Sequence, residues 1–262
     1  IFRPQQLFFK PWGKPYLNLL KCFTQLFVQD ADSHALLLKH GIANSVVTGD
    51  TRFDRVAEIQ QAHKDILVVQ RFIEGSDKVI IAGSTWPKDE QLLAQYMQTL
   101  ENRLDSNENI KLIIAPHEID EKHMHFLFQL FKGRYVRYTQ ANHISMQHMQ
   151  VLIIDTIGLL SSIYQYGTAA YIGGGFGAGI HNSLEAAVYG IPVIWGPKYQ
   201  RFREAKGLIQ SGAAQSIANY KQLEMALDYA LNNHTEIGIK SAQYVQNELG
   251  ATDKLYNRLF KN

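Results

Sequence analysis

The sequence predicts an α/β fold, a doubly wound and mostly parallel sheet with helices on both faces. Two observations favour it. Short apolar segments alternate with helix-length amphipathic segments along most of the chain, which is the βα order of such sheets. Several short segments, such as KVIIAG (78–83) and KLIIAP (111–116), are apolar on both faces, as strands covered on both sides must be.

The element boundaries follow from these runs. Strands are expected at 25–29, 45–49, 78–83, 111–116, 134–138, 151–155, 169–173, 192–196 and 213–217. Helices are expected at 32–40, 54–74, 88–104, 120–132, 158–166, 182–190, 201–211 and 220–231, with one or two more over 234–260. Ligands of this fold bind beyond the carboxyl ends of the strands, so candidate site loops lie at 83–87, 115–120, 155–158 and 173–182.

Composition excludes several classes of protein. The 262 residues are 46% hydrophobic with a net charge of +2, and the basic residues are scattered, which argues against nucleic-acid binding. Cys22 is the only cysteine, which excludes an internal disulfide and a cysteine-rich zinc site. No apolar run is long enough to predict a transmembrane helix.

The chain starts at Ile1 without a methionine, which suggests a fragment or processed product. The segment 1–22 is basic and aromatic, and it fits either an irregular docked segment or a membrane-facing collar.

Glycines crowd the segment YIGGGFGAGIHNSLEAAVYG (171–190), between a predicted strand and a predicted helix. Bare backbone next to a helix start suits a phosphate or carboxylate, although several positive-φ positions would also explain the glycines. Gly173, Gly175 and Ala178 match a dinucleotide pattern. No acidic residue follows the next strand, VIWGP, so nicotinamide binding is disfavoured.

The polar residues that follow this loop have two interpretations. Asn182 and Glu185 can cap the next helix. Alternatively, Glu185 accepts hydrogen bonds from the two hydroxyls of a ribose, while His181 and Asn182 meet the charged part of the ligand.

Three other strand ends carry candidate groups. Ser84 and Thr85 offer hydroxyls for a phosphate or a helix cap, and Pro116-His117-Glu118 follows the next strand. The segment DTIG (155–158) can hold a base or ribose, or cap a helix. The group His117, Glu118, His123 and His125 lacks the spacing of a known zinc motif, so no metal is predicted.

No nucleophile motif is present, which suits an inverting glycosyl transfer that needs only a base and a stabilised leaving group. The segments VTGDTRFD (47–54), AGSTWPKDE (82–90), IIAP (113–116), DTIGLL (155–160) and YIGGGFGAGIHNSLEAAVYGIPVIWGPKYQRFREA (171–205) occur in this order. Together they resemble the C-terminal half of the 3-deoxy-D-manno-octulosonic acid (Kdo) transferases. The resemblance covers this chain from about residue 23 to residue 217.

The resemblance implies the second, Rossmann-like domain of a two-domain GT-B glycosyltransferase of lipopolysaccharide core synthesis. In that family this domain holds CMP-Kdo, and the N-terminal domain holds the lipid A precursor, the membrane anchor and the catalytic glutamate. We therefore expect 1–45 to be a connecting segment or remnant of the acceptor domain and 46–262 to be the donor domain. The fragment is expected to be soluble and inactive alone, its parent to act at the cytoplasmic face of the inner membrane, and neither metal nor other cofactor to be required.

The resemblance also implies site residues, all for binding the donor and none for catalysis: Ser84, Thr85, Pro116, His117, Asp155, Thr156, Gly158, Gly174, Gly175, His181, Asn182 and Glu185. The chain departs from the family pattern at four places. His117 stands where an arginine is common, Leu159 where a glutamate is, Ile180 where a glycine is and Ser183 where a proline is. Two alternatives remain: another GT-B enzyme using a UDP-sugar, such as an epimerase, and a nucleotide-binding domain without chemistry.

Overall fold

The computed structural model describes residues 1–62, 64–103, 108–143, 146 and 148–261. The chain divides into two compact units. One comprises Ile1–Ala57 with Gln246–Asn262, and the other comprises Glu58–Val245.

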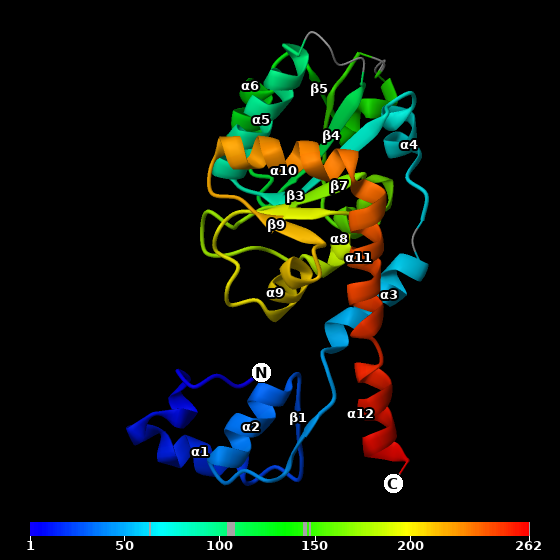
Figure 1. Cartoon of the computed structure of the whole chain (residues 1–262). Coiled ribbons are helices and arrows are strands. Elements are labelled where there is room, and N and C mark those ends of the chain that lie inside the picture. Colours follow the sequence, from blue (N-terminus) through cyan, green and yellow to red (C-terminus); the bar gives the residue numbers. More distant parts are fainter. Residues whose placement is uncertain (63, 104–107, 144–145, 147, 262) are drawn as a thin grey trace. The chain divides into compact units, whose positions relative to one another are not determined.

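Within Glu58–Val245, seven parallel strands form one sheet in the order β5-β6-β4-β3-β7-β8-β9 (Figure 1). The doubly wound parallel sheet predicted from the sequence is confirmed. All seven strands lie within or beside the predicted segments: β3 (Lys78–Thr85), β4 (Ile110–Pro116), β5 (Tyr135–Arg137), β6 (Val151–Ile153), β7 (Ala169–Ile172), β8 (Val193–Trp195) and β9 (Ala214–Ser216).

The switch point of the sheet lies at β3. From β3 the chain runs to β4 on one side, and it later crosses to β7 on the other side. The register pairs Gly83 of β3 with Ala115 of β4 and with Ile172 of β7. Connections that leave in opposite directions open a crevice beyond the carboxyl ends of the strands, so the loops after β3 and β7 border this crevice.

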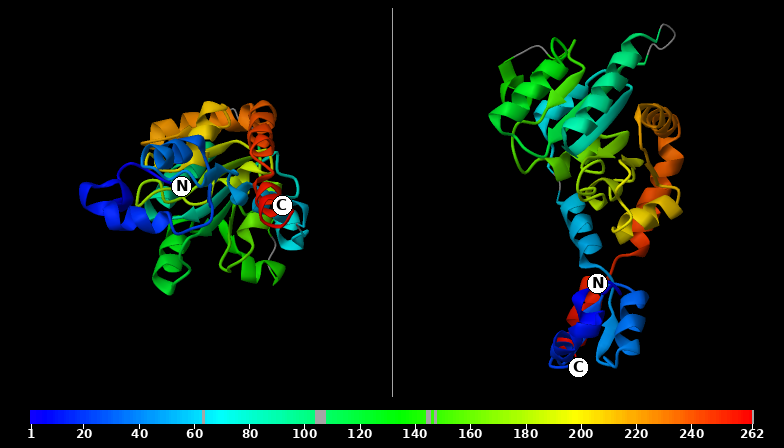
Figure 2. Two further views of the ribbon diagram at one scale, coloured as in Figure 1. Left: turned by 90° about the horizontal axis from the view of Figure 1, so that it is seen from below. Right: turned by 90° about the vertical axis from the view of Figure 1, so that its left-hand side faces the viewer.

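Helices cover both faces of the sheet (Figure 2). The alternation of side chains along β4 shows this, because successive residues of a strand point to opposite faces. Leu112 belongs to the buried cluster that also includes Leu93 of α5 (Pro87–Glu101) and Leu227 of α10 (Tyr220–Asn232). Lys111 points the other way, where its Nζ donates to the carbonyl of Phe72 in α4 (Leu67–Ile73).

One predicted helix was wrong. The segment 54–74 forms two helices, α3 (Thr51–Gln61) and α4, because Ile66 is extended (φ −115°, ψ 92°) and its N–H donates to Tyr166 Oη at 2.8 Å. The predicted helices 158–166 and 182–190 are also shorter than expected. The remaining elements of this unit are α6 (Glu121–Leu130), η3 (Tyr138–His143), α7 (Leu160–Ile163), η4 (Tyr164–Tyr166), α8 (Leu184–Ala187), α9 (Arg203–Gln210) and α11 (His234–Asn247).

The other unit has a small core of its own. Leu20, Val28, Leu37 and Ile42 are buried in it, with phenylalanines from the first nine residues packed against them. Asp54 ties the two chain segments of this unit together, since its carboxylate accepts the N–H groups of Gly250 and Thr252, both at 2.7 Å. Its elements are η1 (Leu7–Phe9), η2 (Pro11–Gly13), α1 (Lys14–Leu20), β1 (Leu26–Val28), α2 (Ala31–Lys39), β2 (Ser45–Val47) and α12 (Ala251–Phe260), with β1 and β2 paired in parallel.

Among the described residues, none of the helices combines the length and apolarity that crossing a bilayer requires.

Candidate nucleotide-sugar site

The turn after β3 and the glycine-rich loop after β7 are packed together at the switch point. Ser84 has a left-handed backbone (φ 52°), and the pairing of β3 with β4 shifts register there. The N–H of Gly173 donates to the Gly83 carbonyl at 2.9 Å. A Cβ on Gly173 would lie 2.1 Å from the Ser84 carbonyl oxygen, so only glycine permits this contact.

The neighbouring glycines are needed for the same reason. A Cβ on Gly174, whose φ is +88°, would lie 2.5 Å from the Gly179 carbonyl oxygen, and one on Gly175 would lie 2.6 Å from the backbone of Gly196. These contacts are backbone against backbone within the protein. The predicted role of Gly174 and Gly175 in letting a ligand approach therefore stays a prediction, since packing alone requires glycine at both positions.

Many N–H groups of the loop are already used. Gly174 donates to Asp89, Gly177 and Gly179 donate to the Gly174 carbonyl, and His181 donates to the Gly173 carbonyl. Further along, the N–H groups of Asn182 and Ser183 donate to no acceptor in the described residues. The Ser183 hydroxyl is buried and has no partner there either. Donors without a protein partner thus lie where the loop meets α8, and the buried Ser183 hydroxyl is the unusual one, because buried donors usually have a partner.

Asp89 in the first turn of α5 was not predicted, yet it joins the two loops. Its Oδ2 accepts the N–H groups of Trp86 and Gly174, both at 3.0 Å, and its Oδ1 accepts the Tyr171 hydroxyl at 2.7 Å. Burial raises the pKa of this carboxyl, against the effect of the three hydrogen bonds. Asp89 fixes the turn after β3 relative to the loop after β7.

The two predicted hydroxyls behave differently. Ser84 is half-buried and makes no hydrogen bond through its hydroxyl in the described residues. Thr85 is fully buried, and its hydroxyl donates to Glu90 Oε1 at 2.9 Å. Glu90 also bonds His123 Nε2 at 2.9 Å, and burial raises the pKa of Glu90. The Thr85 hydroxyl is therefore committed to the protein, so of this pair only Ser84 is available to a ligand.

Three aromatic rings from three loops meet at this edge. The Trp86 indole N–H donates to His181 Nε2 at 3.0 Å, and the planes of the two rings are nearly parallel, 12° apart. His117 stacks on both, with centroid distances of 4.9 Å to Trp86 and 4.3 Å to His181. The backbone N–H of His117 donates to the Thr85 carbonyl at 2.9 Å. This bond extends the contact between the ends of β3 and β4, where Pro116 is buried.

Asn182 and Glu185 bond each other at the start of α8, where Ser183 is the N-cap residue and its side chain makes no capping hydrogen bond. Asn182 Oδ1 accepts the Leu184 N–H at 3.2 Å, and Asn182 Nδ2 donates to Glu185 Oε1 at 2.9 Å. Burial raises the pKa of Glu185, and the Asn182 hydrogen bond partly opposes this shift. Because α8 has only four residues, its dipole is small, and an anion here would depend on the individual donors instead.

The turn after β6 lies at the same edge of the sheet but is separately organised. Asp155 accepts a hydrogen bond from Arg137 Nε at 2.8 Å and two from Thr139, at 3.0 Å from N–H and 2.6 Å from the hydroxyl. Thr156 is half-buried, and Gly158 is exposed with φ +91°. No described contact joins these residues to the three aromatic rings.

Two of the acidic and histidine side chains after β4, Asp120 and His123, are bonded within the protein. Ligand atoms of Glu118, Asp120 and His123 lie within 4.8 Å of one another. However, Asp120 caps α6 by accepting the His123 N–H, and His123 Nε2 is bonded to Glu90. We assign no metal to this group.

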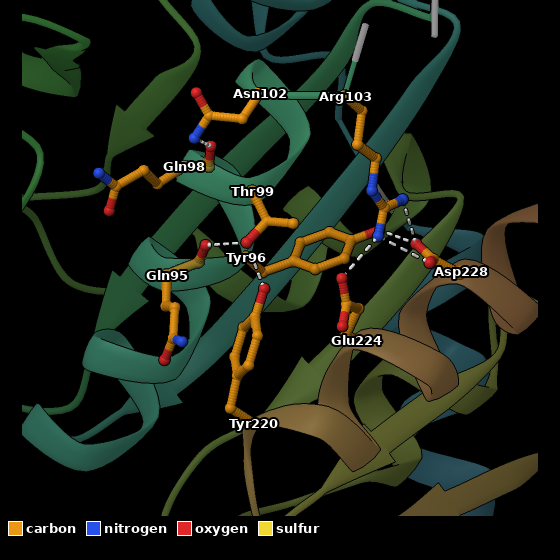
Figure 3. Close-up of polar contacts among 9 residues, drawn as sticks. All are labelled: Gln95, Tyr96, Gln98, Thr99, Asn102, Arg103, Tyr220, Glu224 and Asp228. Carbon is orange, nitrogen blue, oxygen red and sulfur yellow. Dashed lines mark hydrogen bonds and ion pairs between the residues drawn. The ribbon is translucent and has the colours of Figure 1, made fainter. Parts of the chain in front are cut away.

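A second polar cluster lies at the amino ends of β3 and β4, beside a cavity of about 120 Å³ that Lys78 and Ile110 line. Figure 3 shows Tyr96 of α5 and Arg103, which follows the end of that helix, bonded to acidic side chains of α10. Asp228 accepts from the Tyr96 hydroxyl at 2.7 Å and from both terminal nitrogens of Arg103, at 2.9 and 2.8 Å. Arg103 also donates to Glu224 at 3.0 Å. The cluster links α5 and the residues just after it to α10, and both helices cover this face of the sheet.

Known proteins resemble this chain in sequence and, separately, in fold. No protein-family model matches the chain. A curated 3-deoxy-D-manno-octulosonic acid transferase of Rickettsia prowazekii is 25% identical over 258 residues, covering 92% of this chain and 52% of the relative. One of Chlamydia trachomatis is 25% identical over 230 residues, covering 86% of this chain and 51% of the relative. The predicted resemblance is confirmed. The chain spans about half the length of these relatives.

Solved structures confirm the fold. The C-terminal CMP-Kdo binding domain of WaaA from Acinetobacter baumannii superposes with a TM-score of 0.58 at 20% identity, covering 75% of this chain and 97% of that one. A putative UDP-N-acetylglucosamine 2-epimerase from Listeria monocytogenes gives a TM-score of 0.60 at 16% identity, covering 96% of this chain and 63% of that one. At these identities the structures establish the Rossmann-like fold of GT-B enzymes and nothing about substrate.

Proposed function

We propose that this chain supplies the donor-binding part of an inverting glycosyltransferase that moves Kdo from CMP-Kdo to a lipid A precursor in lipopolysaccharide synthesis. The sequence similarity to Kdo transferases supports this choice of substrate. The structure contributes one supporting observation, namely the group of unsatisfied donors at Asn182 and Ser183, which border the switch-point crevice between His181 and Glu185.

These donors suit the charge that develops in the reaction. A sugar hydroxyl of the acceptor attacks the anomeric carbon of Kdo, the bond from that carbon to the phosphate oxygen breaks, and CMP leaves with the electron pair. N–H groups aimed at the leaving phosphate stabilise this charge most in the transition state. Ser84, whose hydroxyl is available beside the crevice, can donate to the same group.

The remaining roles are assigned by the resemblance. Glu185 accepts hydrogen bonds from the ribose hydroxyls, and the backbone around Thr156 and Gly158 holds the base. Asp155 shapes that turn through Arg137, to which it is already bonded.

The acceptor and the catalytic base are not assigned to residues of this chain. By the resemblance they belong to the N-terminal domain of the family, with which residues 1–45 are grouped as a connecting segment. The donor site lies in 46–262, within the unit Glu58–Val245. The full protein is proposed to work at the cytoplasmic face of the inner membrane, where its lipid acceptor is found.

Calorimetric titration of the chain with CMP, CMP-Kdo and UDP tests the proposal. We expect CMP and CMP-Kdo to bind, CMP to bind more tightly than UDP, and the chain alone to transfer no Kdo. Tighter binding of UDP than of CMP would favour the UDP-sugar alternative. If none of the three binds, the proposed function is wrong.

A further inference from the structure

The contact between Trp86 and His181 has no counterpart in the roles assigned so far. We propose that Trp86 is a positioning residue that holds His181 as the neutral tautomer with its proton on Nδ1, so that this N–H is presented to an anionic oxygen of the ligand. The tautomer follows from geometry alone, whereas the ligand rests on the proposed function.

The hydrogen bond itself fixes where the proton lies. An indole nitrogen donates and cannot accept, so His181 Nε2, 3.0 Å from Trp86 Nε1, must be the acceptor. An acceptor nitrogen carries no proton, so the proton of the neutral ring is on Nδ1. The doubly protonated ring would direct an N–H at the indole N–H, and this repulsion disfavours it.

Asp89 holds the backbone of Trp86 and the backbone of Gly174, the glycine against which the His181 ring lies. One oxygen of Asp89 accepts the N–H of Trp86 and the N–H of Gly174, each at 3.0 Å. Gly174 in turn lies against the imidazole, since a Cβ there would be 2.9 Å from His181 Cδ2 and 3.1 Å from Nε2. The indole and the imidazole therefore meet in a geometry that the buried Asp89 carboxylate sets.

His117 adds a second reason for His181 to stay neutral. Its ring stacks on His181 at 4.3 Å, so a charge on both rings would be unfavourable. Partial burial, and next the charge on His117, lower the pKa of His181 below its ordinary value. Stacking on Trp86 as well holds the three rings as one block.

The orientation leaves one polar group of the block for a ligand. The Cδ2 and Nε2 edge of His181 faces Gly174 and Trp86, so Nδ1 lies on the other side of Cγ, where it bonds nothing in the described residues. Its N–H is a donor on the residue that directly precedes Asn182 and Ser183, whose backbone N–H groups also have no acceptor among the described residues. An anionic oxygen is the ligand group that such neighbouring donors fit, and both the phosphate and the carboxylate of CMP-Kdo supply one.

The test compares the chain with Trp86→Phe, which keeps an aromatic ring for His117 to stack on but removes the N–H donor. Trp12→Phe is the matched control, because Trp12 is 69% exposed in the other unit. Long-range ¹H–¹⁵N NMR of the imidazoles reports which nitrogen carries the proton, and His181→Gln identifies the His181 signals. We expect protonated Nδ1 and bare Nε2 in the native chain and in Trp12→Phe, and a shift toward protonated Nε2 in Trp86→Phe.

Ligand titrations then separate the two sources of the anionic oxygen. Losing the orientation that one hydrogen bond provides should weaken binding roughly three- to tenfold. If both CMP and CMP-Kdo bind more weakly to the variant, the Nδ1–H group of His181 donates to the phosphate. If only CMP-Kdo binds more weakly, this group donates to the carboxylate. Unchanged affinity for both overturns the proposed contact with the ligand.

The tautomer measurement stands independently of any ligand. A proton on Nε2 in the native chain, or a His181 tautomer that Trp86→Phe leaves unchanged, overturns the positioning role even if the variant folds poorly. If the native chain binds neither nucleotide, the proposed function fails while the imidazole spectra still decide the role of Trp86.

Discussion

The two ends of the central sheet both carry polar clusters, but the hydrogen-bonding groups of the two clusters are used differently. At the amino ends of β3 and β4, Arg103 is paired with Glu224 and Asp228, and Asp228 also accepts the Tyr96 hydroxyl (Figure 3). At the carboxyl ends, His181 and Ser183 keep donors that bond nothing in the described part of the chain.

The difference shows that charge density alone does not identify a site. The amino-end cluster is the more highly charged of the two, and it lies beside a cavity, yet its charged groups satisfy one another and join α5 to α10. At the carboxyl ends, by contrast, the Ser183 hydroxyl is buried without a partner among the described residues, and the backbone N–H groups of Asn182 and Ser183 have no acceptor there. Unsatisfied capacity at a switch point is the better indicator of ligand binding.

Among the substitutions considered, adding a methyl group to Gly173 is expected to disrupt the carboxyl-end site most. In Gly173→Ala the new Cβ would lie 2.1 Å from the Ser84 carbonyl oxygen and 2.6 Å from Thr85 Cα, so the loop and the turn must separate. We expect a loss of about 3 kcal/mol or more in unfolding free energy. CMP binding should be lost with it. Urea denaturation and CMP titration measure the two effects.

Gly177→Ala is the matched control for this change. The nearest atom to a Cβ there is the Gly174 carbonyl oxygen at 3.5 Å, an ordinary contact. Stability close to that of the native chain is expected. Equal destabilisation by the two alanines would contradict a specific packing role for Gly173.

The fold was largely predictable from the sequence, because strands covered on both faces leave an unmistakable apolar run. KVIIAG and KLIIAP became the adjacent strands β3 and β4 for this reason. The single helix predicted over 54–74 was wrong, since local periodicity carries no information about the hydrogen bond from Ile66 to Tyr166, 100 positions away.

The candidate site was predictable only where a residue's position after a strand was enough. His117 and His181 were singled out in this way and stack on each other, whereas their role in binding the donor, like that of Glu185, stays a prediction. Asp89 and Trp86 were missed, because in the sequence they are ordinary residues of a helix start. Their roles depend on partners 82 and 95 positions away, Tyr171 and His181. An acid at the third position of a helix and a tryptophan just before it are the only local signals.

Glu185→Gln distinguishes the role of Glu185 in ligand binding from its effect on the stability of the fold. Burial raises the pKa of this carboxyl, so its ionised form is disfavoured in the folded chain, and its contribution to stability falls as pH rises from about its ordinary value of 4.5 through the folded pKa. In Glu185→Gln this loss is absent, and the amide oxygen can still accept from Asn182. The variant should therefore gain stability over the native chain as pH rises, and then keep a constant advantage.

CMP binding should change in the opposite direction. Replacing a charged acceptor by a neutral one weakens hydrogen bonds to the ribose hydroxyls, so we expect roughly tenfold weaker CMP binding at pH 7. Thermal unfolding between pH 5 and 8 and calorimetry at pH 7 test both parts. Unchanged CMP affinity would limit Glu185 to its contact with Asn182.

Tyr96→Phe, for which we expect the least change, tests whether the amino-end cluster has a structural role only. Tyr96→Phe removes the hydroxyl that donates to Asp228 at 2.7 Å and leaves the pairing of Asp228 with Arg103 intact. Losing one such hydrogen bond should lower the unfolding free energy by about 1 kcal/mol. CMP affinity should not change, because the cluster lies at the amino ends of the strands and the proposed site at their carboxyl ends. A fall in CMP affinity as large as that of Glu185→Gln would show that the α5–α10 contact supports the donor site, and the distinction between the two ends of the sheet would then be lost.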